Sequence, residues 1–378
     1  MKIAVNTRLL LPDKLEGIGW FTFETLRRIV ASHPEVKFYF LFDRSPDPSF
    51  IFGPNVEAVV LKPPARHPFL YVIWFEWAVK RALDKIQPDL FLSPDGYLSL
   101  GSTIPSLSVL HDLNFEHFPD DLPLLARWHY RSFFPRYAQK AARIATVSEF
   151  SKQDIMQQYG VPAEKIDVVY NGANELFSPL TIEEQQAVRQ RYSEGHPYFL
   201  FVGALHPRKN LVRLFQAFDL YRSQSNQQVK LLIVGEKMFR TKAISQTYEG
   251  MTYKDEVLFC GRMGTSELHK ITASALAITY VSYFEGFGIP IVEAFRCGVP
   301  VITSNVTSMP EVAAEAALLC DPYSVESIAE AMETMATDAE LRNQLVEKGM
   351  ERSHIFTWDA AAQRLWNSIS MALTQSKK

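Results

Sequence analysis

Residues 284–295 read Phe284-Glu285-Gly286-Phe287-Gly288-Ile289-Pro290-Ile291-Val292-Glu293-Ala294-Phe295. The apolar run that ends at Val281 predicts a buried strand, the two glycines predict a tight turn, and Pro290 is typical of the first turn of a helix. Such a turn lets the backbone approach a ligand, and free amides at the helix start attract phosphate. Glu285 precedes the turn, and Glu293 lies one turn into the helix, where a carboxylate can accept two bonds from a sugar diol. A purely structural turn with a dipole-satisfying carboxylate is equally consistent with this pattern.

Outward from this stretch, short β-branched runs alternate with amphipathic helical patterns, which predicts parallel sheets with crossover helices. The pattern runs over residues 2–170, restarts at residue 198 and continues to 303, and the tail is helical. At roughly 150 residues per domain, 378 residues suggest two or three domains. We expect an α/β protein with two doubly wound Rossmann-like domains, residues 1–178 and 179–357, facing a central cleft. A last helix, 358–378, is expected to pack back on the first domain.

Composition narrows the class of protein. The chain is 47% hydrophobic and 21% charged, which excludes disorder, and its net charge of −3 does not favour nucleic acid as a partner. The three cysteines, Cys260, Cys297 and Cys320, fit no zinc spacing and no disulfide framework, so a cytoplasmic location is expected. The N-terminus looks like a first strand rather than a signal peptide. The longest apolar stretch without charge, residues 271–284, is shorter than the roughly 20 residues of a membrane span.

A basic pair, Arg208 and Lys209, follows a predicted strand, and Asn210 is a good N-cap for the next helix. The planar guanidinium of an arginine beside the flexible ammonium group of a lysine suits the binding of a diphosphate. In isolation, an Arg-Lys dipeptide is more often a solvated turn.

Three features of the first domain are further candidates. His111 and Asp112 follow a strand and are expected at the carboxyl end of the first sheet, where the alternative is a histidine paired with its neighbouring aspartate. The long loop 9–19 ends in Gly17 and Gly19 before a helix, and its glycines could approach a sugar or phosphate or belong to an ordinary flexible loop.

Taken together, these segments resemble the retaining glycosyltransferases of family 4, the "group 1" enzymes of GT-B fold. The signature is Glu285 and Glu293, with seven residues between them that include Gly-Phe-Gly-Ile-Pro. The resemblance extends over nearly the whole chain in the expected order, through residues 111–113, 146–151, 169–172, 201–211 and 285–312.

The resemblance implies a role for each candidate. Arg208 and Lys209 would hold the donor diphosphate and stabilise the leaving nucleoside diphosphate. Glu285 would grip the donor sugar together with His111. Further residues are assigned to the donor or to the acceptor side: Glu293 to the ribose, Gly286, Phe287, Gly288 and Ile289 to the donor, Arg262 and Met263 to the nucleotide base, and Gly17, Gly19 and Asp112 to the acceptor side.

Absent motifs narrow the mechanism. The chain contains no Asp-x-Asp pair, no phosphate loop ending in Gly-Lys-Ser/Thr and no Gly-x-Ser-x-Gly elbow. We therefore expect no metal and no cofactor beyond the nucleotide sugar, with the leaving-group charge neutralised by cations and helix-start amides.

In residues 122–148, aromatic side chains alternate with basic ones, and the aromatic stretch 69–77 is followed by basic residues. Aromatic side chains beside basic ones resemble an interfacial membrane contact. The sequence favours the alternative, in which the aromatic residues lie in the core and the charged residues lie on a solvated face. A peripheral contact with the inner face of the membrane therefore stays an expectation.

The expected activity is retaining transfer of a hexose to a glycan or lipid-linked acceptor in surface polysaccharide synthesis. Likeness to bacterial polysaccharide mannosyltransferases favours mannose from GDP-mannose. A UDP-sugar donor is the first alternative, and a nucleotide-sugar epimerase of the same fold is the second.

Overall fold

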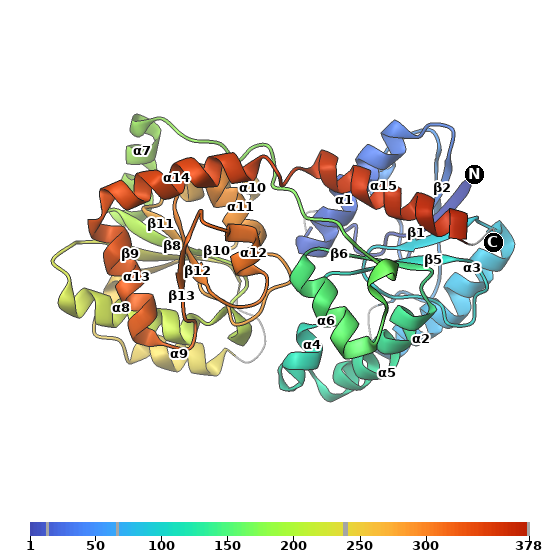
Figure 1. The fold of residues 1–378 in the computed structure, drawn as a ribbon, viewed down its shortest axis with the longest axis horizontal. Coiled ribbons are helices and arrows are strands. Elements are labelled where there is room, and N and C mark those ends of the chain that lie inside the picture. Colours follow the sequence, from blue (N-terminus) through green and yellow to red (C-terminus); the bar gives the residue numbers. More distant parts are fainter. Residues whose placement is uncertain (13–14, 66–67, 237–240, 376–378) are drawn as a thin grey trace. The chain divides into compact units, whose positions relative to one another are not determined.

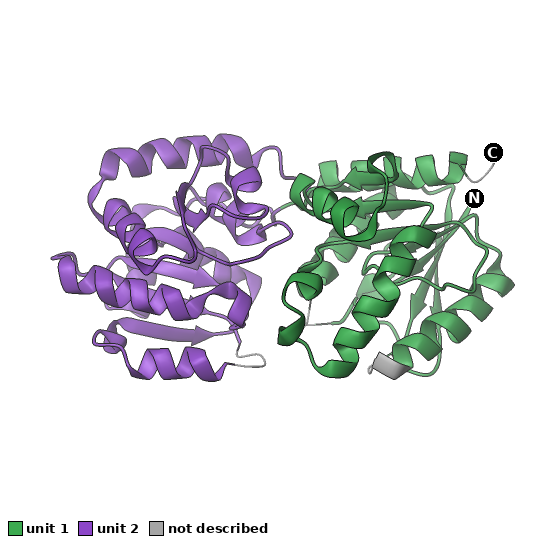
Figure 2. Ribbon diagram, turned by 60° about the horizontal axis from the view of Figure 1, so that its bottom comes forward, with its two compact units in different colours: residues 1–172, 358–378 green, residues 173–357 purple. Residues whose placement is uncertain are grey.

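The computed structural model describes residues 1–12, 15–65, 68–236 and 241–375. The chain divides into two compact units, coloured separately in Figure 2. Unit 1 comprises Met1–Gly172 and Trp358–Lys378, and unit 2 comprises Ala173–Thr357.

Unit 1 contains a seven-stranded parallel sheet with the order β3-β2-β1-β4-β5-β6-β7 (Figure 1). All seven strands lie within residues 2–170, where the sequence pattern predicts parallel strands. Their bounds are β1 Lys2–Asn6, β2 Lys37–Phe42, β3 Val56–Val60, β4 Leu90–Ser93, β5 Ser106–Leu110, β6 Arg143–Thr146 and β7 Ile166–Val168. The central strands read as near-continuous apolar runs because helices bury both of their faces.

Helices cover both faces of the unit 1 sheet, as Figure 1 shows. The helices α1 and α15 pack on each other on one face, and the remaining long helices bury an aromatic core on the other. The bounds are α1 Gly17–Ser32, η1 Pro48–Phe50, α2 Pro68–Ile73, η2 Trp74–Val79, α3 Lys80–Ile86, α4 Asn114–His117, η3 Pro119–Asp121, α5 Leu124–Lys140, α6 Glu149–Tyr159, η4 Ala163–Lys165 and α15 Trp358–Gln375.

Unit 2 repeats the topology with a six-stranded parallel sheet of order β10-β9-β8-β11-β12-β13. Its strands are β8 Tyr198–Val202, β9 Lys230–Val234, β10 Val257–Gly261, β11 Ala277–Tyr280, β12 Val301–Ser304 and β13 Leu318–Cys320. The short edge strand β13 was not expected from the sequence. In both sheets the strand order reverses next to the first strand of the unit, and such a switch point is where doubly wound folds bind ligands. The expected α/β fold with two doubly wound sheets is confirmed.

The helices of unit 2 also lie on both faces of their sheet. On one face α8 packs against α13 and α9, and on the other α11 packs against α14. The bounds are α7 Ile182–Ser193, η5 Pro207–Lys209, α8 Leu211–Gln224, α9 Lys242–Glu249, η6 Lys254–Glu256, α10 Thr265–Ala273, α11 Ile289–Arg296, α12 Met309–Ala313, α13 Val325–Thr337 and α14 Ala339–Ser353.

The units divide at Gly172, six residues before the expected boundary at 178. Phe177 explains the difference, because its buried ring lies 5.9 Å from that of His269 and its carbonyl accepts a hydrogen bond from Arg296. At the other end of the chain, α15 belongs to unit 1, where Trp358 contacts Phe21 edge to face. Residues 376–378 of the expected last segment lie outside the described residues.

Candidate active site

The loops at the carboxyl edge of the unit 2 sheet are tied together by their backbones. The amide of Gly203 donates to Val234, and the amide of Gly235 donates to Gly261, each over 2.9 Å. A Cβ placed on Gly235 would lie 1.9 Å from the carbonyl oxygen of Gly203, and both glycines have a φ of +153°. The close approach therefore requires glycine at position 235.

Arg208, Lys209 and Glu285 form one charged cluster at this edge. The Glu285 carboxylate accepts from Lys209 Nζ at 2.6 Å through Oε1 and from an Arg208 terminal nitrogen at 2.8 Å through Oε2. Arg208 and Lys209 lie in the short helix η5 beyond β8, and Glu285 lies in the loop beyond the adjacent strand β11. The structure thus joins residues 76 positions apart that the sequence analysis assigned to one site.

The charges of the cluster do not cancel. Burial by itself raises the pKa of Glu285, but the neighbouring charges of Arg208 and Lys209 outweigh burial and lower it to about 2. Glu285 is therefore ionised at neutral pH, and one carboxylate between two cations leaves one positive charge. Such a site suits an anionic group held in a partly desolvated setting.

Two further residues support this cluster: Tyr280, which the sequence analysis missed, and Asn210. The Tyr280 hydroxyl accepts from Lys209 Nζ at 2.7 Å, and Nζ lies 4.7 Å from the centre of the Tyr280 ring. Tyr280 ends β11, so a tyrosine at a strand end beside the glycine turn was the available signal. Asn210 is the N-cap residue of α8, as expected, but its side chain does not cap the helix: its backbone is left-handed, and its amide nitrogen donates to the carbonyls of Val281 and Pro322 at 2.9 and 2.7 Å.

The glycine turn is braced from the loop that precedes α12. The hydroxyl of Ser308 donates to the carbonyls of Glu285 and Phe287 at 2.9 and 3.1 Å. Gly288 has a φ of +105° and directly precedes α11, which begins at Ile289. The expected strand–turn–helix unit is therefore present, with its turn held by side-chain bonds.

Glu293 differs sharply from Glu285. It lies one turn into α11 and is partly buried, and its carboxyl group has no hydrogen bond or ion pair with any residue that the structure describes. Burial raises the pKa of Glu293 to about 7. A carboxyl group with open acceptor positions can receive two hydroxyl donors from a ligand.

The loop after β10 holds Arg262 and Met263. Arg262 is exposed and lies 4.0 Å from Glu236, and Met263 is partly buried. Within the described ranges, no hydrogen bond or ion pair connects either residue to Arg208, Lys209 or Glu285. The structure places both at the carboxyl edge of the unit 2 sheet and does not join them to the charged cluster.

In unit 1, His111 directly follows β5 at the carboxyl edge of the sheet. Its Nε2 lies 2.8 Å from the carbonyl of Pro94, so Nε2 carries the proton, and burial lowers the pKa of His111. The neutral ring then offers Nδ1 as an acceptor. Asp112 accepts from the amide of Asn114 at 3.0 Å. The expected alternative, a His111–Asp112 hydrogen bond, is not found between these two described residues.

The expected loop 9–19 ends earlier than predicted, because α1 already begins at Gly17. Gly17 is exposed, with no atom within 4 Å of a Cβ built on it, whereas Gly19 is buried and its Cβ would lie 3.2 Å from Leu15 and from the carbonyl of Leu9. Both glycines therefore lie in the first turn of the helix. Residues 13 and 14 of this loop lie outside the described residues.

The basic and aromatic stretch 122–148 is divided between core and surface. Phe134 and Tyr137 are buried in the core of unit 1, as the alternative expectation had it. At the start of α5, however, Leu124 is 81% and Trp128 55% exposed beside the exposed Arg131. In the second stretch, residues 69–77, Trp77 is also exposed. The side chain of Phe69 lies outside the described residues.

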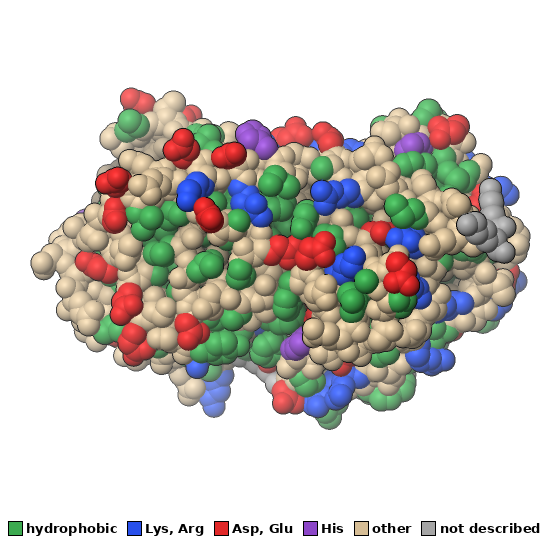
Figure 3. All heavy atoms as spheres, in the orientation of Figure 1, with side chains coloured by type: hydrophobic (Ala, Val, Ile, Leu, Met, Phe, Trp, Pro, Cys, Tyr) green, Lys and Arg blue, Asp and Glu red, His purple; other side chains and the backbone are tan. Residues whose placement is uncertain are grey.

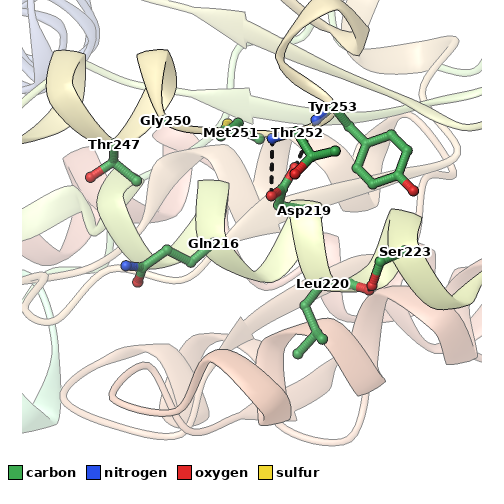
Figure 4. Close-up of a pocket in the computed structure, with 9 residues that line it drawn as sticks. All are labelled: Gln216, Asp219, Leu220, Ser223, Thr247, Gly250, Met251, Thr252 and Tyr253. Atoms are coloured by element: carbon green, nitrogen blue, oxygen red, sulfur yellow. Dashed lines mark hydrogen bonds between the residues drawn. The ribbon is translucent and has the colours of Figure 1, made fainter.

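Other surface features of the described residues provide no further candidate for the active site. Figure 3 shows acidic and basic side chains interspersed over one face. A hollow of about 600 Å³ lies between α8 and α9 (Figure 4), where the Asp219 carboxylate is occupied by the amides of Thr252 and Tyr253 at 3.1 and 2.8 Å. Among the described residues, no group of three or more His, Cys, Asp or Glu side chains is placed to hold a metal ion. In the same part of the chain, no helix combines the length and apolarity that crossing a membrane requires.

Comparison with known proteins identifies the family. The model of "Glycosyl transferases group 1" matches residues 183–352, and that of "Glycosyltransferase Family 4" matches residues 15–175. O-antigen chain mannosyltransferase B of Escherichia coli is 28% identical over 267 residues, 70% of each chain.

Solved structures share the fold. Sucrose-phosphate synthase of Thermosynechococcus elongatus superimposes with a TM-score of 0.77 at 20% identity over 97% of each chain. Anabaena Alr3699/HepE in complex with UDP-glucose gives 0.75 at 20% identity over 98% of this chain and 99% of its own. The chain has the GT-B fold and belongs to glycosyltransferase family 4, retaining enzymes that transfer a sugar from a nucleotide sugar.

Proposed function

We propose that this glycosyltransferase moves mannose from GDP-mannose to a glycan or lipid-linked acceptor of a surface polysaccharide. The donor site is supported by the net positive cluster of Arg208, Lys209 and Glu285, together with Glu293, whose carboxyl group has no partner among the described residues. The mannosyl assignment is supported by the likeness to an O-antigen chain mannosyltransferase. Arg262 and Met263 are assigned to the base, and residues 286–289 to the donor.

In the proposed reaction, the bond between the anomeric carbon and the β-phosphate oxygen breaks, and the acceptor hydroxyl oxygen bonds to the same face of that carbon. The hydroxyl proton passes to the leaving phosphate oxygen. Arg208 and Lys209 neutralise the charge that grows on the diphosphate, and no metal ion is required. Glu285 and His111 hold hydroxyls of the transferred sugar, and Glu293 accepts from the ribose. Gly17, Gly19 and Asp112 are assigned to the acceptor side.

The donor is tested by calorimetric titration with GDP, UDP, GDP-mannose and UDP-glucose. Tighter binding of the guanosine compounds, with α-mannoside formed in the presence of EDTA, is the expected result. Preference for UDP-glucose, the ligand of the Anabaena structure, would replace the donor assignment. Turnover that is lost with EDTA and restored by manganese would contradict the role of the two cations.

We further propose that the start of α5 contacts an anionic membrane surface. The exposed Leu124 and Trp128 can enter the interface while Arg127 and Arg131 face lipid phosphates. Co-sedimentation with phosphatidylglycerol vesicles should exceed that with phosphatidylcholine and should fall in Trp128→Ser. Ile182→Ser, which changes a 70% exposed residue of unit 2, is the matched control. Equal loss in both variants would overturn the contact.

A further inference from the structure

Arg8 stands out among the charged residues of unit 1. It lies two residues beyond β1 at the carboxyl edge of the sheet, and only 8% of its side chain is exposed. Its Nε donates to Asp95 at 2.6 Å. Both terminal nitrogens lack an acceptor among the described residues, yet neither is fully enclosed. Four N–H donors of a buried guanidinium therefore remain open.

Arg143 provides the contrast within the same unit. Its side chain is 6% exposed, and Asp167 fills its fork through Nε at 2.7 Å and a terminal nitrogen at 2.5 Å. Arg143 is satisfied as a structural ion pair. Arg8 uses Nε for Asp95 and leaves its two terminal nitrogens without an acceptor among the described residues, which is an arrangement for receiving a further acceptor.

Aromatic rings hold the Arg8 guanidinium in place. Its central carbon lies 4.8 Å from the ring centre of Tyr71 and 4.5 Å from that of Tyr97. Burial alone would lower the pKa of Arg8, but Asp95 outweighs burial and raises it, so the group stays charged. Oriented, charged donors beside aromatic rings suit a ligand that joins an oxyanion to a sugar ring.

A second observation points to the same place. His129 is 1% exposed, packs parallel to Tyr97 at 5.5 Å, and has no partner at either ring nitrogen in the described structure. The Tyr137 hydroxyl nearby is also unpaired within the described ranges. Buried polar atoms are rarely left unsatisfied in folded proteins. Their concentration around Tyr97 indicates a place where water or ligand completes the hydrogen bonds.

We propose that Arg8 binds the oxyanion of the acceptor, a phosphate or carboxylate attached to a sugar, with Tyr71 and Tyr97 against the sugar. The inference rests on the proposed function, which requires an acceptor, and adds the chemical class of that acceptor. Arg8 presents only hydrogen-bond donors, so its ligand must present acceptors. Two oxygens on one phosphorus or carbon atom match the spacing of the guanidinium N–H groups. Because Asp95 already balances the charge, the fork geometry rather than net charge decides affinity.

The test is calorimetric titration of the full chain with three probes: geranyl diphosphate, glucuronate and methyl α-mannoside. GDP and UDP are saturating, so that the cations of unit 2 are occupied. We expect at least one oxyanion to bind about tenfold tighter than the neutral glycoside, as a charge-assisted hydrogen bond provides. Geranyl diphosphate as the tighter probe indicates a lipid diphosphate, and glucuronate indicates an acidic sugar.

Three variants separate the ligand role from a structural role. Arg8→Gln should lose the oxyanion preference, and Arg8→Lys should lose most of it because a point charge lacks the fork. Arg143→Gln, which breaks a comparably buried pair, should change affinity less than twofold. Equal losses in Arg8→Gln and Arg143→Gln, or no oxyanion preference in the wild type, would overturn the proposal. Nucleotide titration of the same variants tests the donor site separately. If Arg8→Gln does not fold, Arg8→Lys is used for the comparison instead.

Discussion

The carboxyl edges of the two sheets share a topology and differ in how their charges are satisfied. In unit 2, Arg208 and Lys209 are joined to Glu285, and backbone hydrogen bonds connect the surrounding loops. In unit 1, Arg8 leaves one edge of its guanidinium open, and His129 has no partner among the described residues. The comparison teaches that one fold can build a preorganised charged cluster on one sheet and leave open donors on another.

The largest effect should come from Gly235, at the carboxyl edge of the unit 2 sheet, and Gly17 of unit 1 is its contrast. Gly235→Ala should destabilise unit 2 by at least about 4 kcal/mol, because the new Cβ overlaps the Gly203 carbonyl and the backbone is strained. Gly17→Ala should stabilise unit 1 slightly, by up to about 1 kcal/mol, since helix propensity improves and the Cβ meets open space. Thermal unfolding measures both. A stable Gly235→Ala protein would show that the unit 2 loops can separate.

Next in size is the loss of a cation from the unit 2 edge. Lys209→Ala should lower kcat at least about 100-fold, or about 2.7 kcal/mol, because charge grows on the diphosphate as the glycosidic bond breaks. Nucleotide affinity should fall less. The control is Lys230→Ala, which removes a lysine paired with Glu194 at the start of β9. Steady-state kinetics that find Lys209→Ala near the wild-type rate would assign the cluster a structural role alone.

A smaller effect distinguishes the two glutamates by pH. Ligand hydroxyls favour the ionised form of Glu293, whose pKa burial raises to about 7, so affinity for GDP-mannose should rise about tenfold from pH 6 to 8. Glu293→Gln should remove this dependence. Because the folded pKa lies above the unfolded one, stability should also fall as pH rises from about 4.5 to 7, and the variant should not show that fall. A flat wild-type profile would contradict the ribose assignment.

The smallest effect concerns the residue that orients Lys209. Tyr280→Phe keeps the ring beneath Nζ and removes only the hydroxyl that accepts from it. One hydrogen bond is worth about 1 kcal/mol, so kcat should fall about fivefold with little change in nucleotide affinity. Steady-state kinetics measures the change in kcat, and calorimetry measures the change in nucleotide affinity. An equal loss in both would indicate that Tyr280 supports the fold of the loop rather than the position of the amine.

Sequence patterns predicted the long apolar strands well and the short or polar elements poorly. Strand β13 spans only Leu318–Cys320 at a sheet edge, too short for a periodic pattern. Helix α7 is polar on most sides, so it has no apolar stripe to detect. Its Thr181–Glu184 capping box was a usable local signal. Asn210 occupies the expected N-cap position of α8, but its side chain makes no cap hydrogen bond, because its backbone is left-handed and its amide nitrogen is directed to tertiary carbonyls.

The amino-acid pattern is enough to predict the order of strands, turns and helices, and therefore that Arg208, Lys209 and Glu285 all follow strands and share one sheet edge. Apolar periodicity suffices for that, since parallel strands place their carboxyl ends together. Folding is what brings Glu285 between two cations, which lower its pKa to about 2, and buries the Glu293 carboxyl group, which has no partner among the described residues and a pKa of about 7. The two carboxylates read alike in sequence. Protonation depends on burial and on distances to charges far away in the chain, and folding alone sets those distances.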